Sequence, residues 1–363
     1  MKSAPATGPA GLILASAGSY PRSGEAPGQQ VLPQTITLIR KGERTAADLD
    51  DAENTVTSQA ITEQARAGME LLTDGLVRGR DPVSHIAGKY EGVVFRHSRP
   101  FLSSGRTYRQ PVVQGKLQRR PTAPSLAQEF RYACNSLGLL QISDERSGRM
   151  GMKPVFLGPY TLAYCSEGES PALEKTEARA RIFAEALAGE IAELAEAGAT
   201  LIQVDEPAIL ERPEDWLILA EGIFRLLGAR DAARKAGKPV QLALYTYYGD
   251  ATPLFEQLIR LPVDALGLDF SNNGSLAERV ATAGSPMPLA LGLVDGRSAE
   301  LEDPAAAARL AERLLAKIED GRGFLGPSCG LEHLPRARAF EKLGLLAKIR
   351  GRVAGSRESP AHT

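Results

Sequence analysis

Residues able to do chemistry occur in this sequence directly after short apolar runs. In VDEP, Asp205 and Glu206 follow the apolar run TLIQV. In LALYTYYGD, residues 242–250, three tyrosines follow a run of the same kind. Carboxylates and phenols can bind an ammonium group, exchange protons or contribute to a metal site. Both stretches therefore indicate an active site at the ends of strands.

Polar residues also follow the other apolar runs, and a buried carboxylate without partners is costly. Their convergence predicts a shared substrate site, while a ring of helix N-caps and ion pairs is the alternative. The predicted catalytic residues are Asp205 and Tyr247. The predicted substrate-binding residues are Ser19, Tyr20, Arg22, Lys116, Tyr160, Thr161, Glu206 and Asp269, and Cys329 is a possible metal ligand.

The elements that position these residues are eight apolar runs separated by amphipathic stretches. Helices are predicted over 178–199 and over 303–321, where Asp303 is the N-cap and Pro304 opens the first turn. The strands are predicted at 12–18, 112–117, 154–159, 200–207, 240–246, 265–270, 288–295 and 323–329.

Apolar strands that alternate with helices are typical of parallel strands covered by helices. Eight such units predict an α/β fold, a (β/α)8 TIM barrel with an excursion after strand one, in which VVFRH (93–97) belongs to a hairpin. A doubly wound open sheet is the alternative, and no strand runs into GxGxxG to support it. The domain prediction is a disordered tail over 1–10, one barrel domain over 11–351 and a second disordered tail over 352–363.

The composition excludes several classes of partner. The 43 Lys and Arg against 44 Asp and Glu leave a net charge of -1, which gives no indication of nucleic acid. Three scattered cysteines suit neither a disulfide framework nor a zinc knuckle, and they indicate the cytoplasm. No apolar run is long enough to span a membrane. The short run at 10–18 reads as a first strand rather than as a secretory signal.

Taken together, these motifs resemble the cobalamin-independent methionine synthase family. The stretch AEALAGEIAELAEAGATLIQVDEPAIL resembles the helix and strand that lead to the family's IQ-D-E-P-A signature. SYPR, KPVFLGPYTLA and GPSCGLEH resemble further family segments and occur in the family's order. The likeness spans about residues 12–350 and implies a single-barrel, core-type member.

The resemblance implies methyl transfer to a thiol such as homocysteine. The methyl donor it implies is a folate or a corrinoid, and in the second case a corrinoid protein is the partner. It implies that Asp205 holds the amino group of the substrate, with Glu206 assisting. The loop with Ser19 and Tyr20 would hold the substrate carboxylate, and Arg22 would add charge there. From their position after a Gly-Pro turn, Tyr160 and Thr161 are predicted to line a donor pocket, with a turn that satisfies the hydroxyl as the alternative. Tyr247 is predicted to donate a hydrogen bond or act as an acid, with a buried phenol that has one partner as the alternative.

Family members bind zinc through a His-x-Cys pair after strand five, a carboxylate after strand six and a cysteine after strand eight. Here the first two positions fall in the tyrosines of 245–248, while Asp269 and Cys329 match the other two. Zinc is therefore doubtful, because one thiolate, one carboxylate and phenols make a poor tetrahedral site. Two alternatives stay open. One is diverged, zinc-independent chemistry on a small amino-acid-like or sulfur substrate, and the other is a non-catalytic binding barrel.

Overall fold

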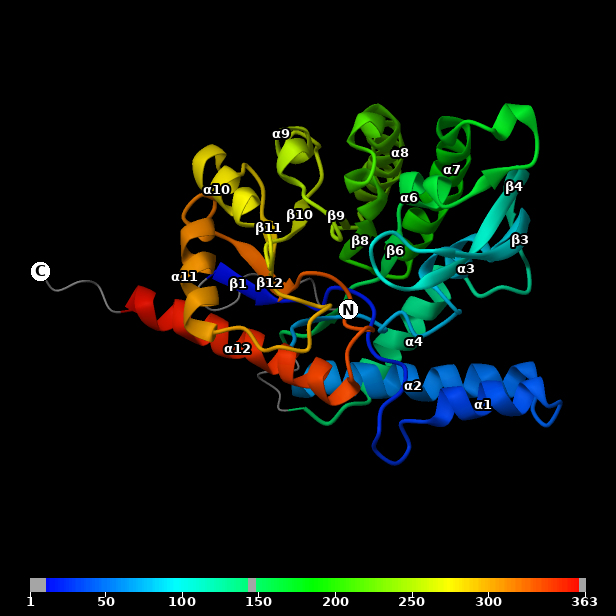
Figure 1. Ribbon diagram of the computed structural model, residues 1–363, viewed down its shortest axis with the longest axis horizontal. Coiled ribbons are helices and arrows are strands. Elements are labelled where there is room, and N and C mark those ends of the chain that lie inside the picture. The colour runs from blue at the N-terminus through cyan, green and yellow to red at the C-terminus, as the bar shows by residue number, and fades with distance from the viewer. Residues whose placement is uncertain (1–10, 143–147, 359–363) are drawn as a thin grey trace, which may run out of the picture.

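A curled parallel sheet lies at the centre of the computed structural model, which describes residues 11–142 and 148–358 (Figure 1). Its seven strands follow the spatial order β1-β12-β11-β10-β9-β8-β6, and all neighbours are parallel. Seven of the eight predicted strands are confirmed. The bounds are Leu12–Leu14 for β1, Val155–Leu157 for β6, Leu201–Asp205 for β8, Gln241–Tyr245 for β9, Ala265–Asp269 for β10, Leu289–Val294 for β11 and Gly323–Pro327 for β12.

Two apolar clusters explain why the sheet is curled. The larger cluster packs one face of the sheet against the helices. Alternate residues of the same strands form a smaller cluster on the opposite face, made of Ala15, Leu71, Leu201, Ala243, Tyr245, Ala265 and Ala290. Ala15 follows an edge strand of the sheet, yet it belongs to the same cluster as Leu201 near the other edge. The side-chain amide of Gln203 on β8 also donates to the carbonyl of Ala17, after β1, at 2.7 Å, and this direct contact across the sheet requires the sheet to bend.

Helices cover the outer face of this sheet, as Figure 1 shows for α7 to α11. The predicted helices α7 and α11 are confirmed, and Asp303 caps α11 by accepting hydrogen bonds from the backbone N–H groups of Ala305 and Ala306. The helices are α1 (Val31–Arg40), α2 (Ala46–Arg66), α3 (Pro82–Ala87), α4 (Leu126–Gly138), α6 (Pro159–Tyr164), α7 (Thr176–Glu196), α8 (Trp216–Lys235), α9 (Phe255–Leu258), α10 (Gly274–Ala283), α11 (Pro304–Leu315) and α12 (Arg336–Glu358).

Two very short strands lie beside the open edge of the sheet. β2 (Leu71–Leu72) pairs in parallel with β5 (Gly151–Met152), which comes just before β6 in the chain. Ala15, which follows β1, forms a parallel bridge with Leu71, and the backbone N–H of Ser16 donates to the carbonyl of Leu71 at 2.9 Å. Backbone hydrogen bonds therefore connect β2 with β1 on one side and with β5 on the other.

The prediction of the second strand at 112–117 is wrong. These residues lie on β4 (Thr107–Arg119), which is antiparallel to β3 (Tyr90–Pro100) and also pairs with the two-residue strand β7 (Glu167–Gly168). The predicted hairpin at 93–97 is its partner. Buried Val113 and Leu117 alternate with exposed Gln114 and Lys116, the pattern of a sheet with one solvated face. Lys116 is thus exposed on the hairpin and does not end a strand of the central sheet.

The structure of the C-terminal end corrects the predicted start of the second tail. Helix α12 continues from Arg336 to Glu358, so the predicted disordered tail is wrong for residues 352–358. The rest of that tail and the predicted tail over 1–10 lie outside the described residues.

The excursion after β1 forms α1 and α2 before the chain returns to the central sheet. These two helices lie side by side below the sheet in Figure 1.

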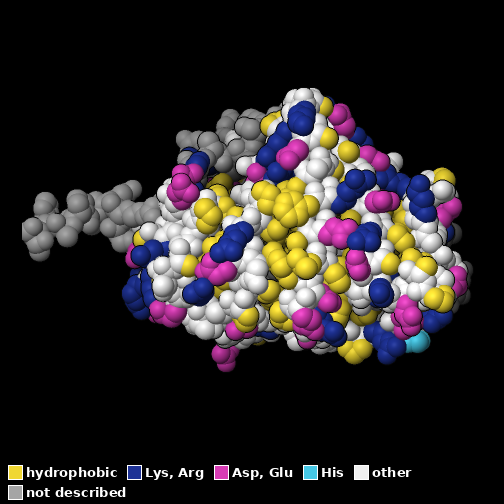
Figure 2. Space-filling view, turned by 90° about the horizontal axis from the view of Figure 1, so that it is seen from above, with side chains coloured by type: hydrophobic (Ala, Val, Ile, Leu, Met, Phe, Trp, Pro, Cys, Tyr) yellow, Lys and Arg dark blue, Asp and Glu magenta, His cyan; other side chains and the backbone are white. Residues whose placement is uncertain are grey.

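Charges of both signs are mixed on the surface. In the face shown in Figure 2, Lys and Arg side chains alternate with Asp and Glu, and apolar side chains gather near the middle. No single-signed field covers this face, as expected from the near-zero net charge. None of the helices within the described ranges is long and apolar enough to cross a membrane.

Candidate functional site

Two connected cavities lie at the ends of the central strands. We call the deeper one the inner pocket; its lining includes Ser19, Asp205, Tyr247, Tyr248, Gly330 and Glu332. The outer cleft has a volume of about 1210 Å³ and shares Ser19, Arg22 and Glu332 with the inner pocket. The inner pocket is narrow, about 30 Å³, so a ligand must displace side chains at its mouth. Sites at the carboxyl ends of parallel strands are typical of this architecture.

Asp205, at the end of β8, is the buried carboxylate of the inner pocket, with 4% of its surface exposed. Its Oδ1 accepts from the side-chain amide of Gln203 at 2.6 Å, and its Oδ2 accepts from the Tyr247 hydroxyl at 2.9 Å. Burial raises the pKa of Asp205 to about 7, although both hydrogen bonds and the charge of Lys153 lower it. No Lys or Arg among the described residues forms an ion pair with it, so the carboxylate is available to a cationic ligand.

Gln203 and Lys153 fix the orientation of the Asp205 carboxylate. Lys153 is buried, donates to the backbone carbonyl of Ser16 at 2.9 Å and lies 4.9 Å from the centre of the Tyr245 ring. It also donates to Oε1 of Gln203. An ammonium can only donate, so the Gln203 oxygen must face Lys153 and the Gln203 amide N–H must face Asp205. Burial lowers the pKa of Lys153 to about 7, while the charge of Asp205 raises it.

The three tyrosines after β9 have different roles. Tyr245 packs inside the sheet beneath Lys153, and Tyr247 donates to Asp205. Burial, and then the charge of Asp205, raise the pKa of Tyr247 well above its ordinary value, so the phenol stays a hydrogen-bond donor. The Tyr248 ring meets the Tyr247 ring edge-on, with ring centres 4.6 Å apart, and both residues line the inner pocket. Strand alternation ends at Tyr245, and Tyr248 takes a positive φ of 71°.

Glu206 is engaged by a helix rather than by the pocket. Its Oε1 accepts from the backbone N–H of Tyr160 at 2.9 Å, and its Oε2 accepts from the backbone N–H of Thr161 at 2.6 Å. These are unsatisfied donors at the start of α6, whose N-cap residue Gly158 has no side chain to offer. A Cβ on Gly158 would lie 2.2 Å from Oε1 of Glu206, so only glycine leaves room for this contact. The N-cap alternative considered for the polar residues therefore describes Glu206.

We expect Glu206→Gln to lower the free energy of unfolding by about 1–3 kcal/mol, because an amide oxygen replaces only one of the two acceptors and a buried N–H loses its partner. Urea unfolding measures this change. The affinity for an amino-acid ligand should stay within about twofold, since Glu206 does not line the inner pocket. Unchanged stability with lost affinity would place Glu206 in the binding site instead.

Tyr160 and Thr161 do not line the inner pocket. The Tyr160 hydroxyl donates to Asp215 at 2.9 Å, and the Thr161 hydroxyl accepts from the backbone N–H of Ala208 at 3.3 Å. Both side chains are fully buried. Their contacts join α6 to the segment that follows β8, and the predicted donor pocket at these two residues stays a prediction.

The loop after β1 reaches the pocket through Ser19 and Arg22. Arg22 lines both cavities, but its guanidinium donates to the backbone carbonyls of Gly79 at 2.5 Å and Leu76 at 3.1 Å. The Tyr20 side chain is buried away from the inner pocket, and Arg336 lies 5.8 Å from its ring centre. Ser19 and Arg22 are therefore placed to meet a ligand, whereas the Tyr20 side chain is not.

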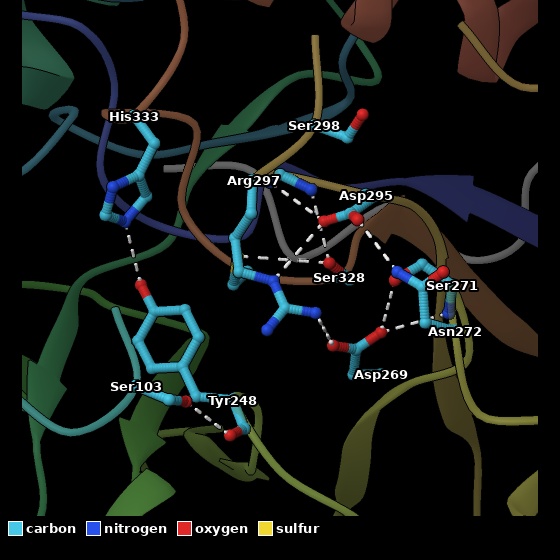
Figure 3. A network of polar contacts seen from close by, with 12 residues as sticks. Ser103, Tyr248, Asp269, Ser271, Asn272, Asp295, Arg297, Ser298, Ser328 and His333 are labelled. Atoms are coloured by element: carbon cyan, nitrogen blue, oxygen red, sulfur yellow. Dashed lines mark hydrogen bonds and ion pairs between the residues drawn. The ribbon is translucent and has the colours of Figure 1, made fainter. Parts of the chain in front are cut away.

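A second polar network lies beside the pocket, after β10 and β11 (Figure 3). Asp269 accepts from the hydroxyl of Ser271 at 2.6 Å and lies 3.7 Å from the guanidinium of Arg297. Arg297 also lies 3.5 Å from Asp295 and 6.0 Å from the centre of the Tyr248 ring. Burial raises the pKa of Asp269, while its hydrogen bonds and Arg297 lower it. Asp269 is thus already paired and does not line the inner pocket.

The residues present do not fit the family's zinc site. Cys329 is fully buried, its Sγ lies 3.5 Å from the carbonyl of Gly330, and burial raises the pKa of its thiol. The strand-five positions are tyrosines, and Asp269 is engaged by Ser271 and Arg297. Nowhere in 11–142 or 148–358 do three His, Cys, Asp or Glu side chains gather in a way that could hold a metal. A tetrahedral zinc site needs four ligands, or three and an open position.

We expect Cys329→Ala to leave the zinc content of the protein unchanged, because a single buried thiol with a raised pKa makes a poor ligand. The check is elemental analysis after incubation with one equivalent of zinc and exhaustive dialysis of both proteins. Stoichiometric zinc in the unchanged protein that disappears in Cys329→Ala would contradict this interpretation.

Sequence reasoning missed three residues of the site. Lys153 and Gln203 are single polar residues within apolar stretches, and their only signal was that a core strand rarely carries them without a partner. Glu332 lies three residues after Cys329, and no local pattern marks it as a site residue. Its place in the lining of both cavities depends on the loop that follows β12.

Comparisons with known proteins agree with this geometry. The catalytic domain of cobalamin-independent synthases matches residues 12–351. A methionine synthase of Methanothermobacter marburgensis is 28% identical over 342 residues, which cover 93% of this chain and 98% of that protein. One from Sulfolobus acidocaldarius is 28% identical and covers 90% of this chain and 87% of that protein. Because the match is to the catalytic domain, the alternative of a non-catalytic barrel is not favoured.

Solved structures extend the comparison to the fold. A B12-independent methionine synthase from Shewanella sp. W3-18-1, solved with selenomethionine, superposes with a TM-score of 0.74 at 17% identity, covering 96% of this chain and 99% of that one. A putative vitamin-B12-independent methionine synthase from Listeria monocytogenes gives a TM-score of 0.68 at 19% identity. The resemblance seen in the sequence is confirmed: the chain is a methyltransferase-type enzyme that belongs to the cobalamin-independent methionine synthase family.

Proposed function

We propose that this enzyme transfers a methyl group to the sulfur of homocysteine and so forms methionine. The new bond joins the methyl carbon to sulfur, the bond between methyl and donor breaks, and the thiol proton is released. The observation that carries the proposal is the buried carboxylate of Asp205, which faces the inner pocket without an ion-pair partner among the described residues. Such a carboxylate suits the ammonium group of an amino acid.

The neighbours of Asp205 support an amino-acid ligand. The Gln203 amide and the Tyr247 phenol each donate to one carboxylate oxygen, and they hold it in one orientation while leaving further lone pairs for a ligand. Ser19 lines the same pocket, where the family resemblance places the substrate carboxylate. The methionine synthases that this chain resembles give the reaction class. Diverged chemistry on another amino-acid-like substrate has no comparable support.

We also infer that the curled sheet closes into an eight-stranded (β/α)8 barrel, with β2 as its second strand and β5 with β6 as its third. The hydrogen bond from Ser16 to Leu71 and the one from the Gly151 N–H to the carbonyl of Glu70 at 2.8 Å support closure. A closed rim would surround the inner pocket on all sides and so exclude water from it.

Methyl-transfer assays test the proposed function. The protein is incubated with L-homocysteine and a trideuteromethyl donor, either a methylcorrinoid or a methyltetrahydrofolate, and mass spectrometry measures deuterated methionine. We expect deuterated methionine from at least one of the two donors. The donor that yields it identifies the donor class. Transfer to other thiols but not to homocysteine from either donor would overturn the proposal.

A further inference from the structure

Glu332 has a buried carboxylate oxygen without a hydrogen-bond partner. Its Oε2 is inaccessible to solvent and accepts nothing from the described residues. Its Oε1 lies 3.4 Å from Nε2 of His333, and Arg106 donates to the backbone carbonyl of Glu332 rather than to its carboxylate. A buried acceptor on a charged group costs free energy unless a donor reaches it, so this oxygen indicates a missing partner.

The position of Glu332 indicates where that partner lies. Glu332 lines both the outer cleft and the inner pocket, and in the inner pocket it lies in the same lining as Asp205. A Cβ on Gly330 would lie 2.2 Å from Oε2 of Glu332, so the carboxylate is held against the backbone of Gly330, another residue of the pocket lining. The unpartnered oxygen is therefore buried beside Gly330 on a residue that shares the inner-pocket lining with Asp205.

Two ionised carboxylates in one small cavity repel each other, and a cation between them stabilises both. The charge of each raises the pKa of nearby acidic groups: Glu332 acts in this way on Asp205, Tyr247 and Cys329. The charge of Arg22, which lines the same pocket, acts on Glu332, but its guanidinium donates to the carbonyls of Gly79 and Leu76 and makes no ion pair with either carboxylate. A ligand that brings its own cation would relieve this repulsion when it binds.

We propose that Glu332 is a second carboxylate that binds the ammonium group of the amino-acid substrate, together with Asp205. This inference rests on the proposed function, because it assigns a further residue to the same substrate. An ammonium has three donors, and two carboxylates can accept two of them. The arrangement selects a ligand with a free amino group over one that carries only a carboxylate, which makes Glu332 a specificity-determining residue.

Three ligands distinguish this role in calorimetric titrations: L-methionine, 4-(methylsulfanyl)butanoic acid, which lacks the amino group, and 3-(methylsulfanyl)propylamine, which lacks the carboxylate. We expect Glu332→Gln to lower the affinity for L-methionine and for the amine by roughly tenfold or more. The affinity for the acid should stay unchanged or rise. Glu341→Gln is the matched control, because Glu341 lines only the outer cleft and pairs with Arg338 at 2.6 Å. It should leave all three affinities unchanged.

The outcomes separate the two proposals. Suppose that Asp205→Asn lowers the affinity for L-methionine, while Glu332→Gln changes the affinity for neither L-methionine nor the amine. The amino-acid pocket then stands, and the role of Glu332 is overturned. If neither variant changes the affinity for L-methionine, the proposed function fails at this pocket. Equal weakening of the acid and the amine by Glu332→Gln would also overturn the inference, because it would indicate a general disturbance of the pocket. Circular dichroism and urea unfolding confirm that each variant is folded.

Discussion

Replacing Asp205 with asparagine is expected to weaken the binding of L-methionine and L-homocysteine by roughly a hundredfold, because it removes the buried negative charge that faces the ligand ammonium. Calorimetric titration measures the loss. Asp215→Asn is the matched control: Asp215 also accepts from a tyrosine hydroxyl, that of Tyr160 at 2.9 Å, but it lies outside the inner pocket. Equal affinities of Asp205→Asn and the unchanged protein would remove Asp205 from the site.

The pH dependence of binding gives an internal control for this substitution. Burial raises the pKa of Asp205 to about 7, so the free protein protonates this carboxyl group below that pH. Only the ionised form attracts an ammonium. The affinity of the unchanged protein for L-methionine should therefore fall from pH 8 to pH 6, approaching tenfold per unit below about 7. Asp205→Asn removes the titrating carboxyl group, so its affinity should change much less over this range than that of the unchanged protein.

Lys153→Met is expected to weaken L-methionine binding by roughly tenfold and to lower the free energy of unfolding by about 1–3 kcal/mol. Without the ammonium, the carbonyl of Ser16 and Oε1 of Gln203 lose their buried donor. The Gln203 amide then keeps its contact with the carbonyl of Ala17 at 2.7 Å but loses the donor that faces its oxygen, so its N–H donor to Asp205 at 2.6 Å is held less firmly. Lys153 thus acts on the ligand through two other residues, as a positioning residue.

A second buried lysine separates the two effects of Lys153→Met. Lys89 donates to Glu129 at 2.6 Å and to the carbonyl of Pro124 at 2.8 Å, and it does not line the inner pocket. Lys89→Met should lower the free energy of unfolding without changing the affinity for L-methionine. If Lys153→Met lowered stability alone, as Lys89→Met is expected to do, the positioning role of Lys153 would be refuted.

The long elements of the fold could be predicted from the sequence, and the short ones could not. Strands such as β8 and β11 are buried at every residue, so their apolar runs stand out. β2 has only two residues, Leu71 and Leu72, and no periodicity can reveal so short a strand. Apolar residues at 112–117 predict the second strand in its place, although the alternation of buried and exposed side chains there is typical of a hairpin.

Only part of the candidate site could be predicted, because only the residues that follow long strands are marked by the sequence pattern. Asp205 and Tyr247 follow long strands, and the structure joins them by a hydrogen bond. Glu206 is adjacent in sequence but serves the N-terminus of α6, a contact between segments that no local pattern reveals. The position of Tyr248 could not be predicted either, because its positive φ reverses the alternation of the strand. Glu332 and Lys153 reach the site only through the tertiary fold.

The most direct test of the account is an experimental structure of the protein with L-methionine bound. We predict that the amino nitrogen lies within about 3.2 Å of a carboxylate oxygen of Asp205, in the pocket that Tyr247 and Ser19 also line. Methionine bound elsewhere on the protein, or in this pocket with its amino group turned away from Asp205, would contradict the account.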